Sequence, residues 1–182
     1  MIIFSACGGN TDLTNENTAS KKQVFHYNQP NSITSLDPAF AKSQNNIWAA
    51  DHLYNRLVEL DEQLHVVPSI ASKWTVSEDG TTYTFTLNDN VYFHDNECFA
   101  GGKGRKVVAQ DVVYSFSRII DEAVASPGSW IFKGRLRADN PFEAPDERTF
   151  VLHLASPFRP MLGILGMHYC CLLYTSPSPR DS

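Results

Sequence analysis

The chain has 182 residues, of which 42% are hydrophobic and 19% charged, and its formal net charge is −5. This composition is typical of a globular protein, and the length allows a buried core to form without disulfides. The chain has no long run of Lys and Arg, so it lacks the clustered positive charge by which proteins bind nucleic acid. No apolar stretch approaches the ~20 residues that cross a bilayer. We therefore expect neither nucleic acid binding nor a membrane-spanning helix.

The first residues differ in character from the rest. Residues 1–7 contain a few apolar residues and two small ones, and they end at Cys7. They resemble the end of a bacterial lipoprotein signal peptide, without its basic n-region and full-length h-region, and Cys7 would then carry a lipid. Residues 8–22, whose only large apolar side chain is Leu13, predict a flexible tether. The alternative is a buried N-terminal strand that ends in a free thiol.

The last residues also stand apart. Residues 171–181 match, codon for codon, the translation of a transposon-based sequencing adapter. We therefore assign residues 171–182 to an adapter artefact and residues 23–170 to the folded domain; a natural Ser/Pro loop is the alternative. Cys98 and Cys170 then remain, and the sequence does not show whether they pair. The absence of a CxxC or Cys/His spacing argues against a zinc or redox site.

The domain is predicted to begin with a strand, a helix and a hairpin. Residues 23–28 predict a strand, and apolar residues at helical spacing predict a helix over 46–59, with Ser43 and Asn45 available as caps. Residues 73–76 and 81–87 predict a hairpin, because turn residues separate them and Tyr83, Phe85 and Leu87 alternate with threonines.

Further elements follow the hairpin. Residues 91–93 predict a third strand, and a Gly-rich loop at 101–104 precedes a second amphipathic helix with Asp111 in its first turn. The apolar face of this helix comprises Val112, Val113, Phe116, Ile119 and Ile120. Residues 140–147 predict a loop and residues 149–154 a strand. The fold class is therefore mixed α/β.

The candidate chemical motifs are weak. The glycines at 101–104 lack the spacing of a phosphate-binding loop. His94, Asp95, Glu97 and Cys98 follow one another closely along an extended chain, which favours a solvated turn over a metal site. The aromatic runs favour sheet core over a stacking platform, and no hydrolase or Cys/His nucleophile motif occurs. We therefore expect no catalytic residues, no metal site and no cofactor.

The order of the sequence motifs is more specific than any one of them. In sequence these are Ser35-Leu-Asp-Pro38, Tyr54-Asn-Arg-Leu-Val-Glu59, Val67-Pro-Ser-Ile-Ala-Ser-Lys-Trp74, Glu78-Asp-Gly-Thr-Thr-Tyr-Thr-Phe-Thr-Leu87, Phe93-His-Asp95 and Ala109-Gln-Asp-Val-Val-Tyr-Ser115. This succession resembles the N-terminal portion of the peptide/dipeptide/nickel (family 5) extracellular solute-binding proteins of ABC transporters. The resemblance covers roughly residues 23–170.

The resemblance implies part of a two-lobed, type II periplasmic-binding-protein-like fold: the start of the first lobe and an extra subdomain, without the second lobe. It also implies a monomeric solute-binding lipoprotein, outside the membrane and anchored by lipid, that captures oligopeptides or dipeptides and delivers them to the ABC permease subunits. The same family binding nickel or another small solute is the alternative. An extracytoplasmic hydrolase or an adhesion lipoprotein is a more distant one.

The resemblance also implies ligand-binding residues. Lys42, Ser43 and Gln44 match the stretch that reaches the ligand backbone in peptide-binding relatives. Gly128 stands where some relatives place a tyrosine at the cleft, so that contact would pass to Ser129 or Trp130. For each of these residues, plain surface or packing between lobes is the alternative.

Two departures from the family pattern have physical consequences. Val108 replaces the usual capping threonine before the second helix, which forfeits about 1 kcal/mol of capping. The loop at 97–106 is longer than usual, and its glycines and basic residues indicate a mobile surface excursion.

Overall fold

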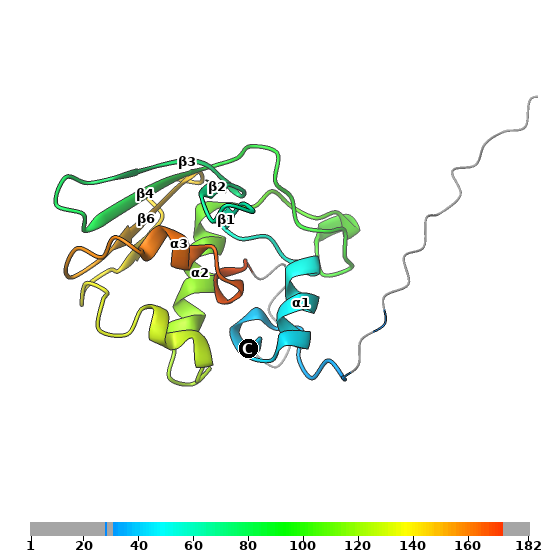
Figure 1. Ribbon diagram of the computed structural model, residues 1–182. Coiled ribbons are helices and arrows are strands. Elements are labelled where there is room, and N and C mark those ends of the chain that lie inside the picture. The colour runs from blue at the N-terminus through cyan, green and yellow to red at the C-terminus, as the bar shows by residue number, and fades with distance from the viewer. Residues whose placement is uncertain (1–27, 29–30, 173–182) are drawn as a thin grey trace, which may run out of the picture. The chain divides into compact units, whose positions relative to one another are not determined.

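A computed structural model describes residue 28 and residues 31–172 of the chain (Figure 1). The described residues from Asn31 onward belong to one compact unit. Its helices are α1 (Gln44–Leu53), α2 (Ala109–Ile120) and α3 (Met161–Leu165), and its 3-10 turns are η1 (Pro38–Phe40), η2 (Ala100–Gly102), η3 (Pro127–Ile131) and η4 (His168–Cys170). Its strands are β1 (Val58–Leu60), β2 (Val66–Pro68), β3 (Ala71–Val76), β4 (Thr82–Leu87), β5 (Phe142–Glu143) and β6 (Thr149–His153). The mixed α/β class is confirmed.

An antiparallel sheet with strand order β3-β4-β6-β5 forms the centre of the fold. The predicted hairpin is confirmed as β3 and β4. Tyr83, Phe85 and Leu87 point into the core, with exposed fractions of 2% or less, and the intervening threonines are half-buried. Gly80 has a φ of +69° in the connecting turn, a conformation that costs glycine little. The predicted strand at 149–154 is β6, which pairs Phe150 with Phe85.

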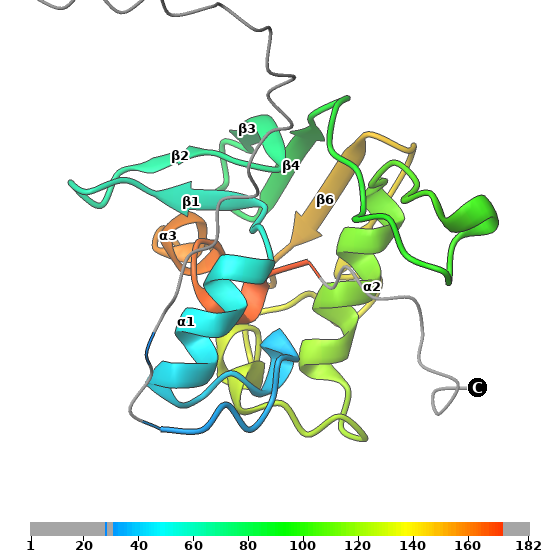
Figure 2. The same cartoon turned by 90° about the vertical axis from the view of Figure 1, so that its right-hand side faces the viewer.

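Helix α2 packs against β5 and β6 (Figure 2). Val112, Phe116 and Ile119 are buried as predicted, whereas Val113 is half-buried and Ile120 is 38% exposed. The aromatic rings of this layer meet at Phe116, whose centroid lies 5.5 Å from Phe132, 5.8 Å from Phe142 and 5.4 Å from Phe150. These rings join the helix to the sheet.

The N-terminus of α2 is capped although the side chain of its N-cap residue cannot accept a hydrogen bond. Val108 has no side-chain acceptor, but its N–H donates to the Asp111 carboxylate at 2.9 Å. Arg105 forms a two-pronged ion pair with the same carboxylate, with one contact of 2.7 Å. Asp111 therefore retains half of a capping box, which offsets part of the expected loss.

The predicted helix over 46–59 is wrong in its second half. α1 ends at Leu53, and Tyr54 is extended with a φ of −129°. Residues 58–60 instead form β1, which pairs antiparallel with β2. Leu57 and Val58 continue the apolar spacing of α1, and both are buried. The local sequence pattern does not show that this part of the chain pairs with β2.

Two smaller predictions also need correction. Residues 91–93 form no strand: Tyr92 is 58% exposed and makes only an isolated bridge with Lys106. The predicted loop at 140–147 contains the short strand β5, which pairs with β6. The predicted strand at 23–28 lies outside the described residues except for Asn28, as do the lipidation site Cys7 and the tether at 8–22.

The structure describes two residues of the segment assigned to an adapter, Cys171 and Leu172. Both are buried, and the Leu172 N–H donates to the Asn55 carbonyl at 3.0 Å. Residues 173–182 lie outside the described part, so the adapter assignment stays a prediction. Cys98 is exposed and Cys170 buried, and both thiols are free, so they do not pair. Burial raises the pKa of Cys170 far above its usual range and that of Cys171 to about 12, which keeps both thiols protonated.

No helix in the described part of the chain is long and apolar enough to span a membrane.

Candidate functional site

The segment that contains Lys42, Ser43 and Gln44 leads from η1 into the first residue of α1. The Ser43 hydroxyl accepts a hydrogen bond from the Asn46 N–H at 3.4 Å, which confirms Ser43 as the N-cap of α1. All three side chains are exposed. The segment therefore presents an ammonium, a hydroxyl and an amide at the start of a helix.

Hydrogen bonds hold the chain on both sides of this segment. The Asp37 carboxylate accepts from the Ala39 N–H at 2.9 Å and caps η1. The Asn46 side chain accepts from the Thr34 N–H at 3.0 Å and donates to the Thr34 hydroxyl at 2.9 Å. Asn46 is 3% exposed, so this reciprocal pair is a buried anchor. The backbone of the segment is thereby positioned before any ligand arrives.

The second predicted segment forms η3. Ser126 caps this turn by accepting from the Gly128 N–H at 3.1 Å. Gly128 is buried, and a Cβ atom there would lie 2.6 Å from Cγ of Tyr169. The ring of Tyr169 thus occupies the space that the Cβ atom of a tyrosine at position 128 would need. Ser129 is half-buried, and Trp130 is 45% exposed.

Two contacts hold η1, which precedes the first segment, to parts of the chain that are far away in the sequence. The Ser126 hydroxyl donates to the Ala39 carbonyl at 2.6 Å. Arg118 of α2 contacts both carboxylate oxygens of Asp37, at 2.8 and 3.2 Å. η1 is therefore held between η3 and α2.

A pocket of about 340 Å³ lies at this junction. Its lining residues are Thr34, Ser35, Phe40, Lys42, Ser43, Asn46, Ala125 and Pro127. We call it the Lys42 pocket. Of the predicted ligand residues, it brings together Lys42 and Ser43. Gln44 and Trp130 do not line it, and Ser129 lines a different cavity.

Sequence reasoning missed the residues that build the Lys42 pocket. Phe40 and Asn46 line it, while Ser126 and Arg118 fix its walls. The Ser126-Pro127 pair is a recognisable cap signal. No sequence signal identifies Ala39 as the partner of Ser126.

Asp79 and Asp95 have structural roles in turns. Asp79 accepts from the Thr81 N–H in the hairpin turn at 3.1 Å. Asp95 accepts from the Gly104 N–H at 3.0 Å and pairs with Lys103, which closes the loop at 97–106. The Gly104 hydrogen bond, followed by that of Lys103, lowers the pKa of Asp95. Within residues 28 and 31–172, no three metal-ligating side chains gather.

A polar cluster on the side of α1 involves the end of the described chain. Arg56 forms an ion pair with Asp51, and Cys171 forms a backbone bridge with Arg56. Burial lowers the pKa of the neighbouring His168 imidazole, while the Asp51 carboxylate opposes the shift. This cluster ties η4 to α1, and none of its residues lines the Lys42 pocket.

Comparison with known proteins identifies the family. The model of the middle region of the bacterial extracellular solute-binding proteins, family 5, matches residues 65–173, which is more than half of the chain. The chain belongs to this family. Family 5 comprises solute-binding proteins rather than enzymes, and the resemblance inferred from the motifs is confirmed.

Two peptide-binding proteins are similar to parts of this chain. The chain is 39% identical over 107 residues to the probable di/tripeptide-binding protein 5 of Pseudomonas aeruginosa, covering 58% of this chain and 18% of the relative. It is 37% identical over 129 residues to the dipeptide-binding protein of Escherichia coli, covering 66% of this chain and 24% of the relative. The chain thus spans no more than about a quarter of the length of either relative.

A solved structure of a periplasmic binding protein agrees with the fold. The periplasmic binding protein DppA of Helicobacter pylori, in complex with the peptide STSA, matches with a TM-score of 0.65 and 31% identity. The match covers 77% of this chain and 28% of that one. The structural neighbours are two-lobed periplasmic binding proteins, so the chain corresponds to part of that fold, as predicted.

Proposed function

We propose that the chain is the opening part of a receptor that binds dipeptides or oligopeptides outside the membrane and delivers them to the permease of an ABC importer. The observation that carries the proposal is the Lys42 pocket, to which two predicted ligand residues contribute. Relatives named as dipeptide-binding proteins support peptide as the solute class. Delivery would follow from closure of two lobes on the bound peptide.

The chemistry of the Lys42 pocket suits a peptide. Lys42 supplies a cation for a carboxylate or a backbone carbonyl, and Ser43 supplies a hydroxyl. Phe40 and Pro127 add apolar surface next to these polar groups. Peptide side chains could then occupy roomy, hydrated space, so that affinity would not require sequence selectivity. Gln44, Ser129 and Trp130 would contact the peptide beyond the pocket.

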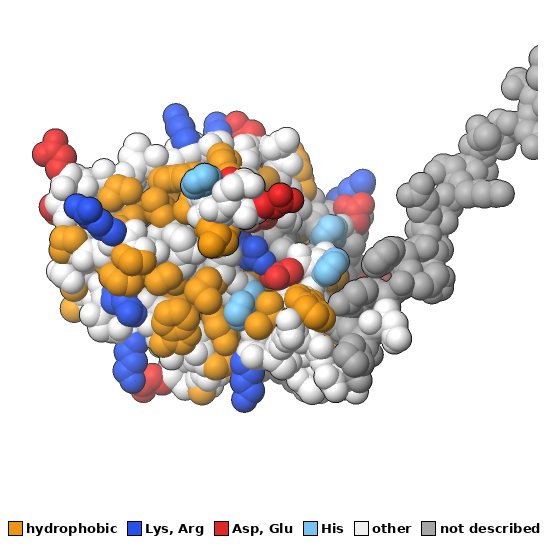
Figure 3. All heavy atoms as spheres, viewed as in Figure 1, with side chains coloured by type: hydrophobic (Ala, Val, Ile, Leu, Met, Phe, Trp, Pro, Cys, Tyr) orange, Lys and Arg blue, Asp and Glu red, His pale blue; other side chains and the backbone are white. Residues whose placement is uncertain are grey.

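Exposed apolar side chains support the proposal that this unit packs against the rest of a two-lobed protein. Figure 3 shows apolar side chains gathered on the face that carries α3. Elsewhere in the unit, Trp48 and Leu53 are 38% and 46% exposed. Such surface would pack against elements that follow in the complete protein.

Calorimetry on the protein expressed from the complete reading frame tests the proposed function. We expect di- to tetrapeptides to bind and Ni²⁺ not to bind. Replacing Lys42 by glutamine should weaken peptide binding about fivefold, because one exposed charge-assisted contact is lost. Lys73→Gln removes the same charge from the exposed face of β3 and should have no effect. Uptake of Ni²⁺ without peptide would refute the peptide assignment while leaving the family intact.

We also propose that Cys7 carries a lipid and anchors a monomeric receptor at the outer side of the membrane. The small residues before Cys7 and the polar segment after it support this proposal. When the complete reading frame is expressed in a bacterial host, radioactive palmitate should label the protein and leave a Cys7→Ser variant unlabelled. Equal labelling of both proteins would contradict the proposed anchor.

A further inference from the structure

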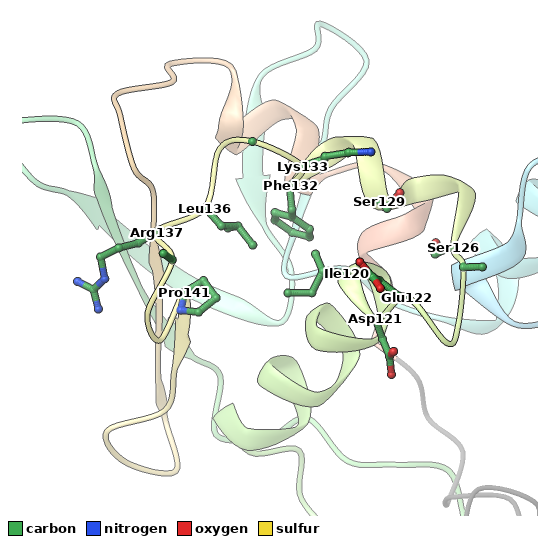
Figure 4. A pocket seen from close by; sticks show the side chains of 13 residues that line it. Ile120, Asp121, Glu122, Ser126, Ser129, Phe132, Lys133, Leu136, Arg137 and Pro141 are labelled. Carbon is green, nitrogen blue, oxygen red and sulfur yellow. The ribbon is translucent and has the colours of Figure 1, made fainter.

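A second cavity lies next to the Lys42 pocket, and residues of the 125–129 segment line both. It has a volume of about 530 Å³ and is formed by the end of α2, η3 and the loop that leads to β5 (Figure 4). We call it the Ile120 cavity. A volume between 300 and 1,000 Å³ is typical of sites for small molecules. Of the ligand residues that the family resemblance implied, Ser129 lines this cavity.

The walls of this cavity are held by hydrogen bonds of the protein itself. The Asp121 carbonyl accepts from the N–H groups of Val124 and Ala125, at 3.2 and 3.1 Å. The Lys133 N–H donates to the Ser129 carbonyl at 2.9 Å. The cavity is therefore formed before a ligand binds, which lowers the entropy cost of binding.

The floor of the Ile120 cavity is apolar. Phe132 is 1% exposed and its ring contacts Phe142, with centroids 5.2 Å apart. Ile120 continues the apolar face of α2, yet it is 38% exposed because it borders the cavity. Figure 4 shows Ile120, Phe132 and Leu136 turned toward the hollow. An apolar group placed there would cover surface that the protein leaves open to water.

The rim carries charges of both signs. Glu122 and Lys133 line the cavity, and no ion pair engages either side chain within the described part of the chain. Asp121, which precedes Glu122, is already engaged: its carboxylate accepts a hydrogen bond from the Ala123 N–H at 2.8 Å. Arg137 donates to the Asp139 carbonyl at 2.9 Å and points away from the cavity in Figure 4. Glu122 and Lys133 are thus the charges available to a ligand.

We propose that the Ile120 cavity binds a small zwitterion with an apolar side chain, such as an aliphatic amino acid or dipeptide. Its ammonium group pairs with Glu122, its carboxylate pairs with Lys133, and its side chain covers Ile120 and Leu136. Opposite charges above an apolar floor match this class of compound better than a purely apolar or a singly charged one. The Ile120 cavity shares only Ala125 with the lining of the Lys42 pocket, and its proposed ligand contacts do not depend on the proposed function.

An NMR titration of the ¹⁵N-labelled 182-residue chain with leucyl-leucine tests the proposal. We expect saturable shifts of the Ile120, Lys133 and Leu136 amide signals, with a Kd on the order of 1 mM for so small a ligand. N-acetyl-leucyl-leucinamide has the same side chains and neither terminal charge, so it should bind at least about tenfold more weakly.

Variants separate this site from a nonspecific effect. Glu122→Gln and Lys133→Gln should each weaken binding about fivefold, and Lys73→Gln should not change it. Both replaced side chains are exposed, so an unchanged spectrum of the free variant shows that the fold is retained. Shifts confined to the Lys42 and Ser43 amides would overturn the proposal and leave peptide binding at the Lys42 pocket intact. Equal affinity for the two ligands, or for all three variants, would also overturn it.

Discussion

Replacing Phe116 by alanine should lower the free energy of unfolding by about 4 kcal/mol, the cost typical of deleting a fully buried aromatic ring. The Phe116 side chain is 0% exposed, and its ring contacts three others, those of Phe132, Phe142 and Phe150. Its loss would leave a cavity between α2 and the sheet, bordered by rigid rings that collapse poorly. Urea unfolding followed by circular dichroism measures the change.

Two matched variants give this prediction its control. Phe116→Leu retains most of the apolar volume and should cost about 1 kcal/mol, which keeps the protein measurable if the alanine variant does not fold. Val113→Ala removes apolar atoms from a half-buried position of the same helix and should cost about 1 kcal/mol. A loss at Phe116→Ala no greater than at Val113→Ala would show that the ring cluster is not the centre of the core.

The sequence predicts the sheet well where the signals are local. Alternation of Tyr83, Phe85 and Leu87 beside a turn is sufficient to define β4, because the two-residue period directly reflects which face is buried. The same kind of local pattern fails for residues 54–59. There, Val58 lies at helical spacing from the residues of α1 but pairs with Pro68 of β2. Local periodicity carries no information about that partner.

The candidate site could be predicted only in part, for a similar reason. Ser43 is recognisable as a cap, and the motifs place Lys42 next to it. The Lys42 pocket, however, depends on the hydrogen bond from Ser126 to Ala39, which are 87 positions apart. The exposure of Ile120 is equally nonlocal, because the loop after η3 borders the end of α2 without covering it. Such contacts follow from the fold as a whole.

Replacing Gly128 by alanine should destabilise the protein by about 2 kcal/mol, as expected for overpacking in a well-filled core. The new Cβ atom would lie 2.6 Å from Cγ and 2.7 Å from Cδ1 of Tyr169, which is only 8% exposed. Gly128 does not have a positive φ, so the backbone itself accepts alanine. The cost should therefore arise from the Tyr169 side chain, mainly from its ring, and it should appear as a lower urea midpoint.

The ring contact predicts that Gly128→Ala costs less when the Tyr169 ring is removed. In a Tyr169→Ala background, Gly128→Ala should cost less than about 1 kcal/mol, because only the contact with the Cβ atom of residue 169 at 3.0 Å remains, and alanine at 128 also reduces the conformational entropy of the unfolded chain. Gly163→Ala is the matched control: this glycine lies within α3 with no atom within 4 Å of its Cβ position, so alanine should stabilise the helix by about 0.5–1 kcal/mol. If Gly128→Ala behaved like Gly163→Ala in the protein with Tyr169 intact, the ring would not restrict position 128. Contact with the Tyr169 side chain could then no longer explain why position 128 is a glycine.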